Sequence, residues 1–545
     1  MTDIKKNDVV ELEITDLNNL GNGVGRIDGR VVFVRGAVSG DLVRARIIKI
    51  NKSFLVARLE EIIMPSPDRA EGFCSSPLSC GGCVYRNVSY SRELELKYSY
   101  VKNEFIKAGL TDAEILPVIS TGKDRAYRNK GQYPLTKIKG KTVAGFYESR
   151  THKVIPAEEC AIQNTVFAPI LRLVCSTADE FGWSVYDEEN GRGLLRHIYL
   201  RTGEATRETM LCLVINGREL LHSDVLVERV REQFPCVVSI MLNFNCEDTN
   251  VVLGDEYKLL YGKEGIEDEL CGLRFFIRPA SFYQVNREGA ELLYSKAREA
   301  ASLTGGEIIA DLYCGTGTIG LSMAGKAKRL CGIEIEPSAV DCARENALRN
   351  NISNADFVCG DASDKDTILS AFGGLTPDVV IIDPPRKGST RELIDTLSEL
   401  EVKKVVYVSC APDTLARDLA YFLERGYRMS SVQPVDMFPR CGHVESVCLL
   451  SKLNTKQHIE INLDMDEMDL TDAEKKATYQ KIKDYVLEHS GLKVSSLYIA
   501  QVKQMCGIIE RENYNKPKSE DAKQPQCPPD KEKAIKEALK HFGMI

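Results

Sequence analysis

The feature that most constrains the fold is a regular alternation of apolar, strand-like runs with helical segments between about residues 280 and 452. This rhythm predicts a doubly wound α/β domain, in which ligands bind beyond the carboxyl ends of the strands. A chain of 545 residues is also too long for one hydrophobic core, so we expect further domains. The strands expected here are Ile308–Ala310, Arg329–Ile335, Val379–Ile382, Val405–Val408 and Ser446–Leu450.

Two more domains are predicted before this one. Residues 1–63 contain short alternating runs separated by glycines, a pattern typical of a small β-barrel of the type that binds oligonucleotides. The runs are Val9–Ile14, Arg30–Val34, Leu42–Ile48 and Phe54–Leu59. Residues 64–278 indicate a central α+β domain, followed by the α/β domain over 279–453. Strands of the central domain are expected at 194–201, 209–216, 237–245 and 273–277.

The remaining residues, 454–545, form a C-terminal extension. Its segments are an acidic stretch at 464–472, a helical candidate at 472–489, a Pro/Lys-rich segment at 514–530 and a short helix around 531–541. The pattern fits a small helical module, such as a helix-turn-helix, and equally a partly disordered extension of unknown role.

Charge gives a mixed indication about nucleic acid. The net charge of −8 argues against it, since affinity for phosphate needs Lys and Arg. Residues 121–153, however, carry only two acidic side chains, Asp124 and Glu148. The basic and aromatic residues of this segment are Lys123, Arg125, Arg128, Lys130, Lys137, Lys139, Lys141, Arg150 and Lys153, with Tyr127, Tyr133, Phe146 and Tyr147. Both an RNA-binding surface and a solvated hairpin fit this pattern.

The cysteines are predicted to be reduced thiols. The polar segment 1–8 lacks the apolar core of a signal peptide, which favours a cytoplasmic location, where disulfides are rare. Most of the 18 cysteines are therefore expected to be small buried hydrophobic residues. No apolar run of about 18 residues is present, so we expect no membrane role.

A cofactor site is predicted at the first strands of the α/β domain. Residues 308–320 read as an apolar strand, a Gly-x-Gly-x-x-Gly turn and a helix, with Asp311 before the glycines. Glu334 ends the next strand, where a carboxylate can accept hydrogen bonds from both hydroxyls of a ribose. Asp361 and Asp383 add two further acids, and a negatively lined pocket suits a sulfonium cation better than a pyrophosphate. The spacing indicates a class I S-adenosylmethionine methyltransferase; a nicotinamide oxidoreductase is the alternative, and it does not explain Asp383-Pro384-Pro385.

A catalytic pair is predicted further along the chain. Cys410 stands between an apolar strand and a helix, where helix-terminal N–H groups favour a thiolate. Carbon 5 of uracil attacks a methyl sulfonium only after a thiolate has added to carbon 6, and a base must then remove the carbon 5 proton. Glu445, just before the last strand, is the candidate base, with His443 and Cys441 as rivals in the same loop. A spacer cysteine buried in the core is the structural alternative for Cys410.

Taken together, these motifs resemble the bacterial TRAM-domain family of RNA uracil-5 methyltransferases, in particular its 23S ribosomal RNA branch. The resemblance covers residues 1 to about 452 and includes the barrel, the segments 281–286 and 383–388, Ser409-Cys410 and the segment 442–445. It implies that Cys410 is the nucleophile and Glu445 the proton-abstracting base. It also implies that S-adenosylmethionine is bound by Gln284, Tyr313, Glu334, Asp361 and Asp383.

A cluster of cysteines in the central domain is predicted to bind metal. Cys74, Cys80 and Cys83 surround a Gly81-Gly82 turn, and Cys160 follows much later. Four cysteines can hold a tetrahedral zinc ion or a 4Fe-4S cluster, and spacing alone does not decide between them. The family resemblance favours 4Fe-4S. The expected role is structural, because binding would fix both ends of the basic segment.

The predicted function is 5-methyluridine formation in 23S ribosomal RNA by a monomeric enzyme. The uracil must be unpaired or flipped, since a stacked base hides carbon 6. The alternatives are the same reaction on transfer RNA, whose bacterial enzymes typically lack the barrel and the cysteine cluster, and an RNA-binding iron–sulfur protein without catalysis. A methyltransferase for exocyclic amines is disfavoured, because it needs no thiol and carries an aromatic residue where Arg386 stands.

Overall fold

The computed structural model describes residues 4–70, 72–149, 151–157, 159–453, 479–506 and 527–542. The chain divides into two compact units, Met1–Asn454 and Thr455–Ile545, which are described separately.

The first unit begins with the predicted barrel, which is confirmed. Its strands close in the order β1-β2-β3-β5-β4, with antiparallel pairs throughout except for the parallel pair β3–β5. Alternate residues such as Leu12, Ile14, Val32 and Val34 point into a common core, as a period of two requires. The strands are β1 (Val9–Leu17), β2 (Asn22–Ile27), β3 (Arg30–Arg35), β4 (Leu42–Ile50) and β5 (Phe54–Met64).

A central sheet follows, with the order β12-β11-β10-β9-β6-β7-β8. Helices α2 (Phe167–Glu180) and α3 (Ser223–Gln233) pack on one face of it. Tyr199, Met210 and Met241 point from the opposite face into the core of the α/β domain. Because both faces are covered, the middle strands are buried along their whole length. The strands are β6 (Lys130–Ile138), β7 (Lys141–Tyr147), β8 (Val154–Pro156), β9 (Leu195–Thr202), β10 (Thr209–Ile215), β11 (Val237–Phe244) and β12 (Glu256–Gly262). A hairpin of β13 (Ile266–Leu270) and β14 (Leu273–Ile277) leads onward.

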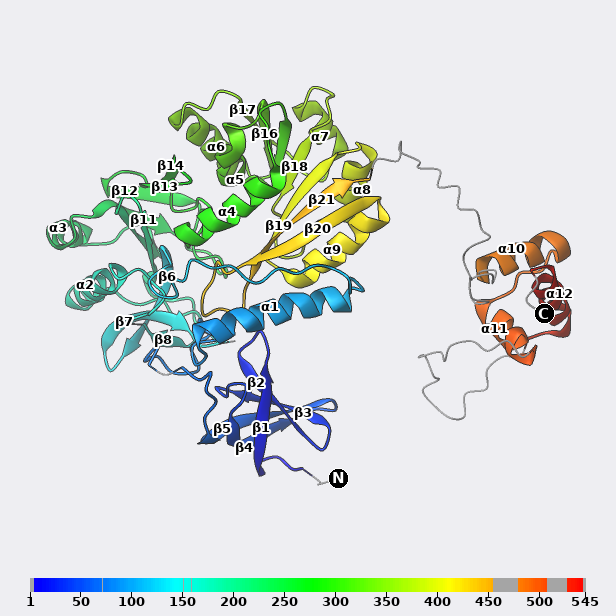
Figure 1. The fold of residues 1–545 in the computed structure, drawn as a ribbon. Coiled ribbons are helices and arrows are strands. Elements are labelled where there is room, and N and C mark those ends of the chain that lie inside the picture. Colours follow the sequence, from blue (N-terminus) through cyan, green and yellow to red (C-terminus); the bar gives the residue numbers. More distant parts are fainter. Residues whose placement is uncertain are drawn as a thin grey trace. The chain divides into compact units, whose positions relative to one another are not determined.

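The predicted α/β domain is confirmed as a sheet of order β17-β16-β15-β18-β19-β21-β20 with helices on both faces (Figure 1). The first five strands in this order are parallel to one another. Strand β21 is antiparallel to both of its neighbours, β19 and β20. The strands are β15 (Ile308–Leu312), β16 (Arg329–Glu334), β17 (Ala355–Cys359), β18 (Val379–Ile382), β19 (Lys404–Ser409), β20 (Tyr427–Val435) and β21 (Glu445–Lys452). The helices are α4 (Arg287–Ala301), α5 (Thr318–Ala324), α6 (Pro337–Arg349), α7 (Lys365–Ala371), α8 (Arg391–Glu399) and α9 (Pro412–Glu424).

Helix α1 (Tyr90–Lys107) joins this domain from far upstream in the sequence. Ser89 caps its first turn, and Val101 and Phe105 enter the same core as α8 and α9. The following segment runs beside β20, with Ile119 N–H donating to the Pro434 carbonyl at 3.1 Å. The α/β domain is therefore completed by residues that precede the central sheet (Figure 1).

The second unit contains, among its described residues, α10 (Tyr479–Ser490), α11 (Ser496–Met505) and α12 (Pro529–His541). Ile482, Val486, Ile499, Val502 and Ile535 form a small core of their own. The expected acidic stretch at 464–472, residues 472–478 of the helical candidate and most of the Pro/Lys-rich segment lie outside the described residues. No helix in the described parts of either unit is long and apolar enough to cross a membrane.

Candidate active site

One pocket of about 890 Å³ opens at the carboxyl ends of β15, β16, β18 and β19. Every residue predicted to bind the cofactor or to catalyse the reaction lines it: Gln284, Tyr313, Glu334, Asp361, Asp383, Cys410 and Glu445. The topology explains this convergence, because parallel neighbouring strands deliver their following loops to the same edge of the sheet.

The glycine-rich loop orients the carboxylate at the end of β16. The Gly315 N–H donates to Glu334 Oε2 at 3.0 Å, and the Glu336 N–H donates to Oε1 at 3.0 Å. Tyr313 has a left-handed backbone with φ of 64°, a strained conformation for a non-glycine residue that is common at binding sites. Asp311 is buried beneath the loop and accepts the Gly320 N–H at 2.8 Å, so it supports the loop without lining the pocket.

The two remaining acids differ in protonation. Asp361 accepts hydrogen bonds from the backbone and the hydroxyl of Ser363, which lower its pKa. Burial of Asp383 raises its pKa to about 7. At neutral pH Asp361 is therefore firmly ionised, whereas Asp383 readily changes charge.

Helix α9 holds the loop that carries Asp383. Buried Asp418 accepts hydrogen bonds from the Ser389 N–H and the Tyr407 hydroxyl, both at 2.7 Å. Gly388 has φ of +80°, and a side chain there would begin 2.5 Å from Asp418 Oδ2, so only glycine fits. Thr414 Oγ1 adds a bond of 3.3 Å to the Arg386 carbonyl.

Cys410 lies between β19 and α9, as predicted, but its pKa moves in the opposite direction to the one expected. Burial, reinforced by the charges of Glu445 and Asp383, raises the thiol pKa to about 11. The expectation that the helix terminus favours the thiolate is therefore wrong, because desolvation and two nearby carboxylates outweigh the helix.

Glu445 is only 6 % exposed at the start of β21. Burial and the neighbouring Asp383 raise its pKa to about 8, against the opposing effect of Arg386. Of its two rivals, His443 lines the same pocket, whereas Cys441 does not and instead donates from Sγ to the Gly82 carbonyl at 3.2 Å. Nearby charge and burial thus single out Glu445 as a carboxyl that can carry a proton near neutral pH.

Comparisons with known proteins identify the family of the chain. Residues 257–453 match the family model described as tRNA (Uracil-5-)-methyltransferase, and residues 5–59 match the TRAM domain. A protein of Clostridium tetani described as an uncharacterized RNA methyltransferase is 41 % identical over 456 residues, covering 83 % of this chain and 98 % of that protein. A relative in Halalkalibacterium halodurans with the same description is 41 % identical over 452 residues, with the same shares covered. The chain belongs to the TRAM-domain RNA (uracil-5-)-methyltransferase family.

A solved structure supports the family assignment across most of the first unit. The Pyrococcus abyssi tRNA (uracil-54, C5)-methyltransferase, in complex with S-adenosyl-L-homocysteine, has a TM-score of 0.66 and 26 % identity, and covers 81 % of this chain and all of that one. The chain is accordingly an S-adenosylmethionine-dependent RNA methyltransferase. The segment matched by the family model contains all the predicted pocket residues.

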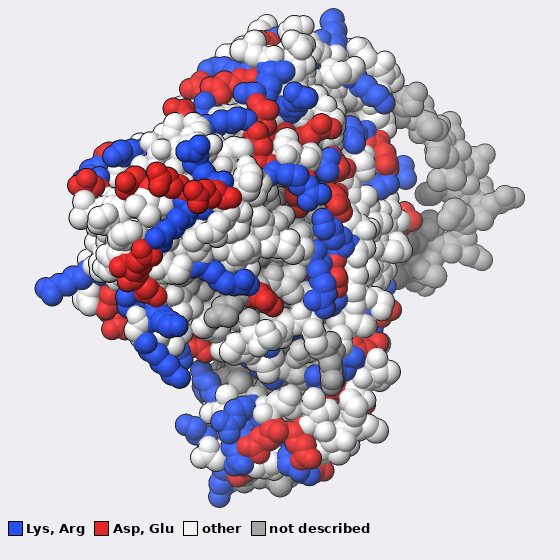
Figure 2. Space-filling model, turned by 90° about the vertical axis from the view of Figure 1, so that its left-hand side faces the viewer, with Lys and Arg blue, Asp and Glu red and all other residues white. Residues whose placement is uncertain are grey.

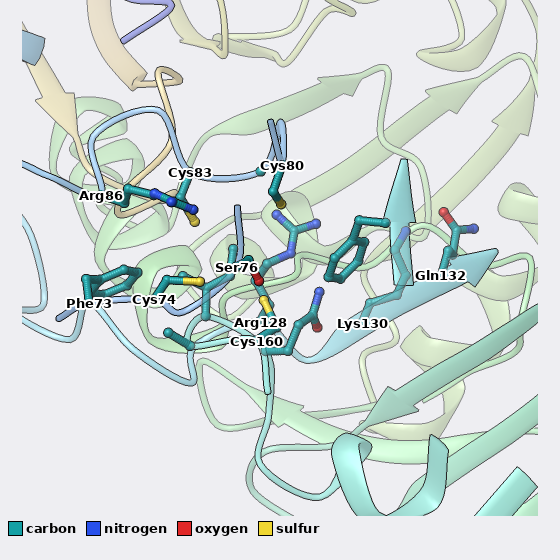
Figure 3. A pocket seen from close by; sticks show the side chains of 15 residues that line it. Phe73, Cys74, Ser76, Cys80, Cys83, Arg86, Arg128, Lys130, Gln132 and Cys160 are labelled. Carbon is teal, nitrogen blue, oxygen red and sulfur yellow. The ribbon is translucent and has the colours of Figure 1, made fainter. Parts of the chain in front are cut away.

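The clustered cysteines of this methyltransferase line a second, smaller pocket of about 290 Å³ (Figure 3). Cys74, Cys80, Cys83 and Cys160 share it with Arg86, Arg128 and Lys130. In the described residues, no three His, Cys, Asp or Glu side chains are grouped so as to hold a single metal ion. Gln163 also lines the pocket, and its Oε1 is buried without a hydrogen-bond partner.

The basic segment differs in one respect from the expected RNA-binding surface. Tyr127 and Tyr133 are fully buried, so they are core residues that cannot stack on bases. Arg150 lies outside the described residues. Figure 2 shows acidic and basic side chains interspersed over one face of the molecule, with uncharged areas between them.

The pocket is supported from behind by residues that the sequence motifs do not indicate. Helix α1 places Glu93 and Lys97, both fully buried, against Asp436 in the segment that leads to Glu445. A capping Ser89 and apolar residues at helical spacing, Leu96, Val101 and Phe105, are the signals that predict this helix. The pairing with Asp436 has no such local signal.

Proposed function

We propose that this methyltransferase forms 5-methyluridine in RNA through a covalent bond between Cys410 Sγ and carbon 6 of uracil. The observation that carries the proposal is the shared pocket, in which Cys410 and Glu445 lie with the acids expected to bind S-adenosylmethionine. A thiol is unnecessary for methylating an amine, but it is required to activate carbon 5 of uracil.

The charges of the pocket suit this order of events. Bound S-adenosylmethionine would bring a sulfonium cation into this pocket, and a positive charge beside Asp383 and Cys410 would lower the pKa of both groups and so favour the thiolate. The thiolate would add to carbon 6, and carbon 5 of the resulting enolate would take the methyl group from the sulfonium, whose sulfur keeps the bonding electron pair and leaves as S-adenosylhomocysteine. The ionised form of Glu445 would then remove the carbon 5 proton, the C–H electrons would re-form the double bond between carbons 5 and 6, and the Cys410 thiolate would leave. A raised pKa makes Glu445 a stronger base than an ordinary glutamate.

The residues proposed for the cofactor divide its recognition. Glu334, already oriented by two backbone N–H groups, accepts from the ribose hydroxyls. Asp361, with its lowered pKa, stays an acceptor for the adenine side of the pocket. Gln284, Tyr313 and Asp383 line the same pocket and would complete the wall around the bound cofactor.

We propose 23S ribosomal RNA as the substrate and transfer RNA as the second candidate. The resemblance of the motifs to the ribosomal branch supports the first. The second rests on the Pyrococcus abyssi tRNA enzyme, which covers 81 % of this chain, so the shared architecture also serves transfer RNA in that protein. The proposed enzyme is cytoplasmic and acts as a monomer.

We further propose that Cys74, Cys80, Cys83 and Cys160 hold a 4Fe-4S cluster in preference to zinc. The family resemblance favours the cluster, whereas a zinc ion would need four sulfurs at about 2.3 Å. A roomy pocket lined by thiols, with Arg86, Arg128 and Lys130 beside them, suits a larger group of negative net charge. When bound, the cluster supplies a structural tie between the two ends of the segment 74–160.

The first experiment identifies the product. Purified protein is incubated with labelled S-adenosylmethionine and, in parallel, with undermodified 23S ribosomal RNA and transfer RNA, and nucleosides are analysed by mass spectrometry. Wild type is expected to produce 5-methyluridine, and Cys410→Ala to lose more than about a thousandfold in rate. Equal activity of Cys410→Ala contradicts the mechanism, and the RNA that is labelled decides the substrate.

A second experiment measures metal in protein purified without oxygen. We expect about four iron atoms and four acid-labile sulfides per chain and no stoichiometric zinc. Cys80→Ser is expected to lose most of the iron, while Cys236→Ser, outside the pocket, keeps it. Zinc at one ion per chain contradicts the proposal.

A further inference from the structure

We propose that Lys97 is a positioning residue for the reaction: it fixes the segment 436–441, which leads into Glu445, and so sets the geometry of proton removal from carbon 5. The inference rests on the proposed role of Glu445 as the base. It concerns a buried ion cluster, defined as Glu93, Lys97, Asp436 and Arg440.

All three donor positions of the Lys97 ammonium are used inside the protein. Its Nζ donates to Glu93 Oε1 at 2.8 Å, to Asp436 Oδ1 at 2.7 Å and to the Phe438 carbonyl at 3.1 Å. Two of these three bonds go to the segment before Glu445, and Phe438 itself lines the catalytic pocket. Lys97 therefore ties α1 directly to a wall of the active site.

The other members of the ion cluster hold the same segment. Asp436 Oδ2 accepts the Tyr90 hydroxyl at 2.8 Å, and Glu93 Oε1 accepts the Arg440 N–H at 2.7 Å. The Arg440 guanidinium pairs with Asp124 and donates to the Val88 carbonyl at 2.7 Å. Arg440 also has a left-handed backbone, φ of 69°, which these contacts keep in place.

Successive carbonyls of the segment are bound from different sides. The Met437 carbonyl accepts from Asn286 at 3.0 Å, Phe438 from Lys97, Pro439 from the Tyr127 hydroxyl at 2.8 Å and Arg440 from the Tyr85 N–H at 3.1 Å. These donors come from α1, the cap of α4, the approach to β6 and the cysteine-bearing loop. Bonds to four successive carbonyls hold the segment 436–441 in one conformation. The chain that leads into Glu445 is thereby fixed, which suits a base that must remove one particular proton.

Stability alone does not explain the ion cluster. Burying two cations and two carboxylates costs free energy that well-packed apolar side chains avoid, so buried ion pairs are weak contributors to stability. The hydrogen bonds between such charged groups are strong and directional, so they fix the relative positions of the groups that they join. A fixed geometry beside the catalytic pocket is the property that this arrangement supplies.

The test compares Lys97→Met with Glu445→Gln and a matched control. Without a working base, the methylated intermediate cannot eliminate, so enzyme accumulates as a covalent RNA adduct that survives denaturing electrophoresis. We expect Lys97→Met to accumulate this adduct and to lower kcat by about tenfold to a hundredfold without changing KM for S-adenosylmethionine. Lys107→Met, on the same helix but with a 69 % exposed side chain, is expected to behave as wild type.

Each result decides between the possibilities. Adduct with Glu445→Gln and Lys97→Met, but not with Lys107→Met, supports the inference. The inference is overturned if Lys97→Met turns over as fast as wild type. It is also overturned if Lys97→Met turns over slowly without forming adduct while it still binds S-adenosylhomocysteine. Either result leaves Glu445 as the proposed base. Full turnover by Glu445→Gln refutes the proposed base and the inference with it. If Lys97→Met does not fold, Tyr90→Phe decides, because it removes only the hydroxyl on Asp436 and is expected to give the same adduct at a lower level.

Discussion

At the scale of single residues, burial and nearby carboxylates set the protonation of three groups in the catalytic pocket. Burial raises the pKa of Asp383, Glu445 and Cys410; the charge of Asp383 adds to the shift of the other two, and the charge of Glu445 adds to that of Cys410. Groups coupled in this way titrate as a set, so adding one positive ligand changes the charge of all of them.

This coupling predicts the pH dependence of Cys410 alkylation. With a thiol pKa near 11, the thiolate fraction and hence the iodoacetamide rate rise about tenfold per pH unit between pH 7 and 9. Sinefungin, a cationic cofactor analogue, is expected to accelerate the reaction at pH 7 if it leaves the thiol accessible, and an uncharged analogue is the control for access. The rate is followed by mass spectrometry of the peptide that contains Cys410. A rate independent of pH over this range contradicts the assigned shift.

At the scale of elements, the loops at the edge of the sheet are held by the helices that follow them. Asp418 on α9 binds both the loop after β18 and Tyr407 on β19. The Asp418 carboxylate on α9 thus aligns β19, which is followed by Cys410, with the loop that carries Asp383. Loss of the Asp418 hydrogen bonds is therefore expected to disturb the active site, although Asp418 itself does not contact the substrate.

Replacing Asp418 tests this arrangement. Asp418→Ala leaves the buried Tyr407 hydroxyl without its acceptor and leaves the Ser389 N–H only the longer bond to the Tyr407 oxygen, at 3.2 Å. We therefore expect a loss of about 1–3 kcal/mol in the free energy of unfolding. Asp413→Ala, exposed in the first turn of the same helix, is the control and is expected to cost about 0.5 kcal/mol. Urea unfolding and S-adenosylhomocysteine binding measure the two effects. Equal stability of the two variants rules the arrangement out as a stabilising feature.

At the scale of the whole molecule, the first unit is one compact body although its described residues form a closed barrel and three further sheets. The central sheet and the α/β domain share one hydrophobic core, which includes Tyr199, Met241 and Leu293. Relatives that align over 98 % of their length cover only 83 % of this chain, so they are shorter than it. The second unit has a separate core.

Deleting the second unit is therefore expected to spare the methyltransferase. A chain ending at Asn454 should keep S-adenosylhomocysteine affinity and melt within about 2 °C of the full chain, since none of the catalytic pocket is removed. A chain that lacks only residues 527–545 is the comparison for this deletion. It loses Ile535 and Leu539 from the small core, so Ile482 and Val486 are expected to become exposed and to bind a hydrophobic dye. Loss of cofactor binding in the shorter chain contradicts this separation.

The sequence by itself determined the local parts of this enzyme. The alternating apolar runs specify the α/β sheet, and the chain order of parallel strands then brings Asp311, Glu334, Asp383 and Cys410 to one edge, because every such loop follows a carboxyl end. The barrel likewise follows from alternation with a period of two.

Only the tertiary structure decided how these residues are supported and charged. Lys97 and Asp436 are 339 residues apart, and no periodicity links them. Burial of Tyr127 and the raised pKa of Cys410 depend on segments packed from elsewhere in the chain. The alternation of apolar and polar residues in the sequence predicts strands and helices. The burial of a side chain and the charges around it depend on how those elements pack in the folded protein.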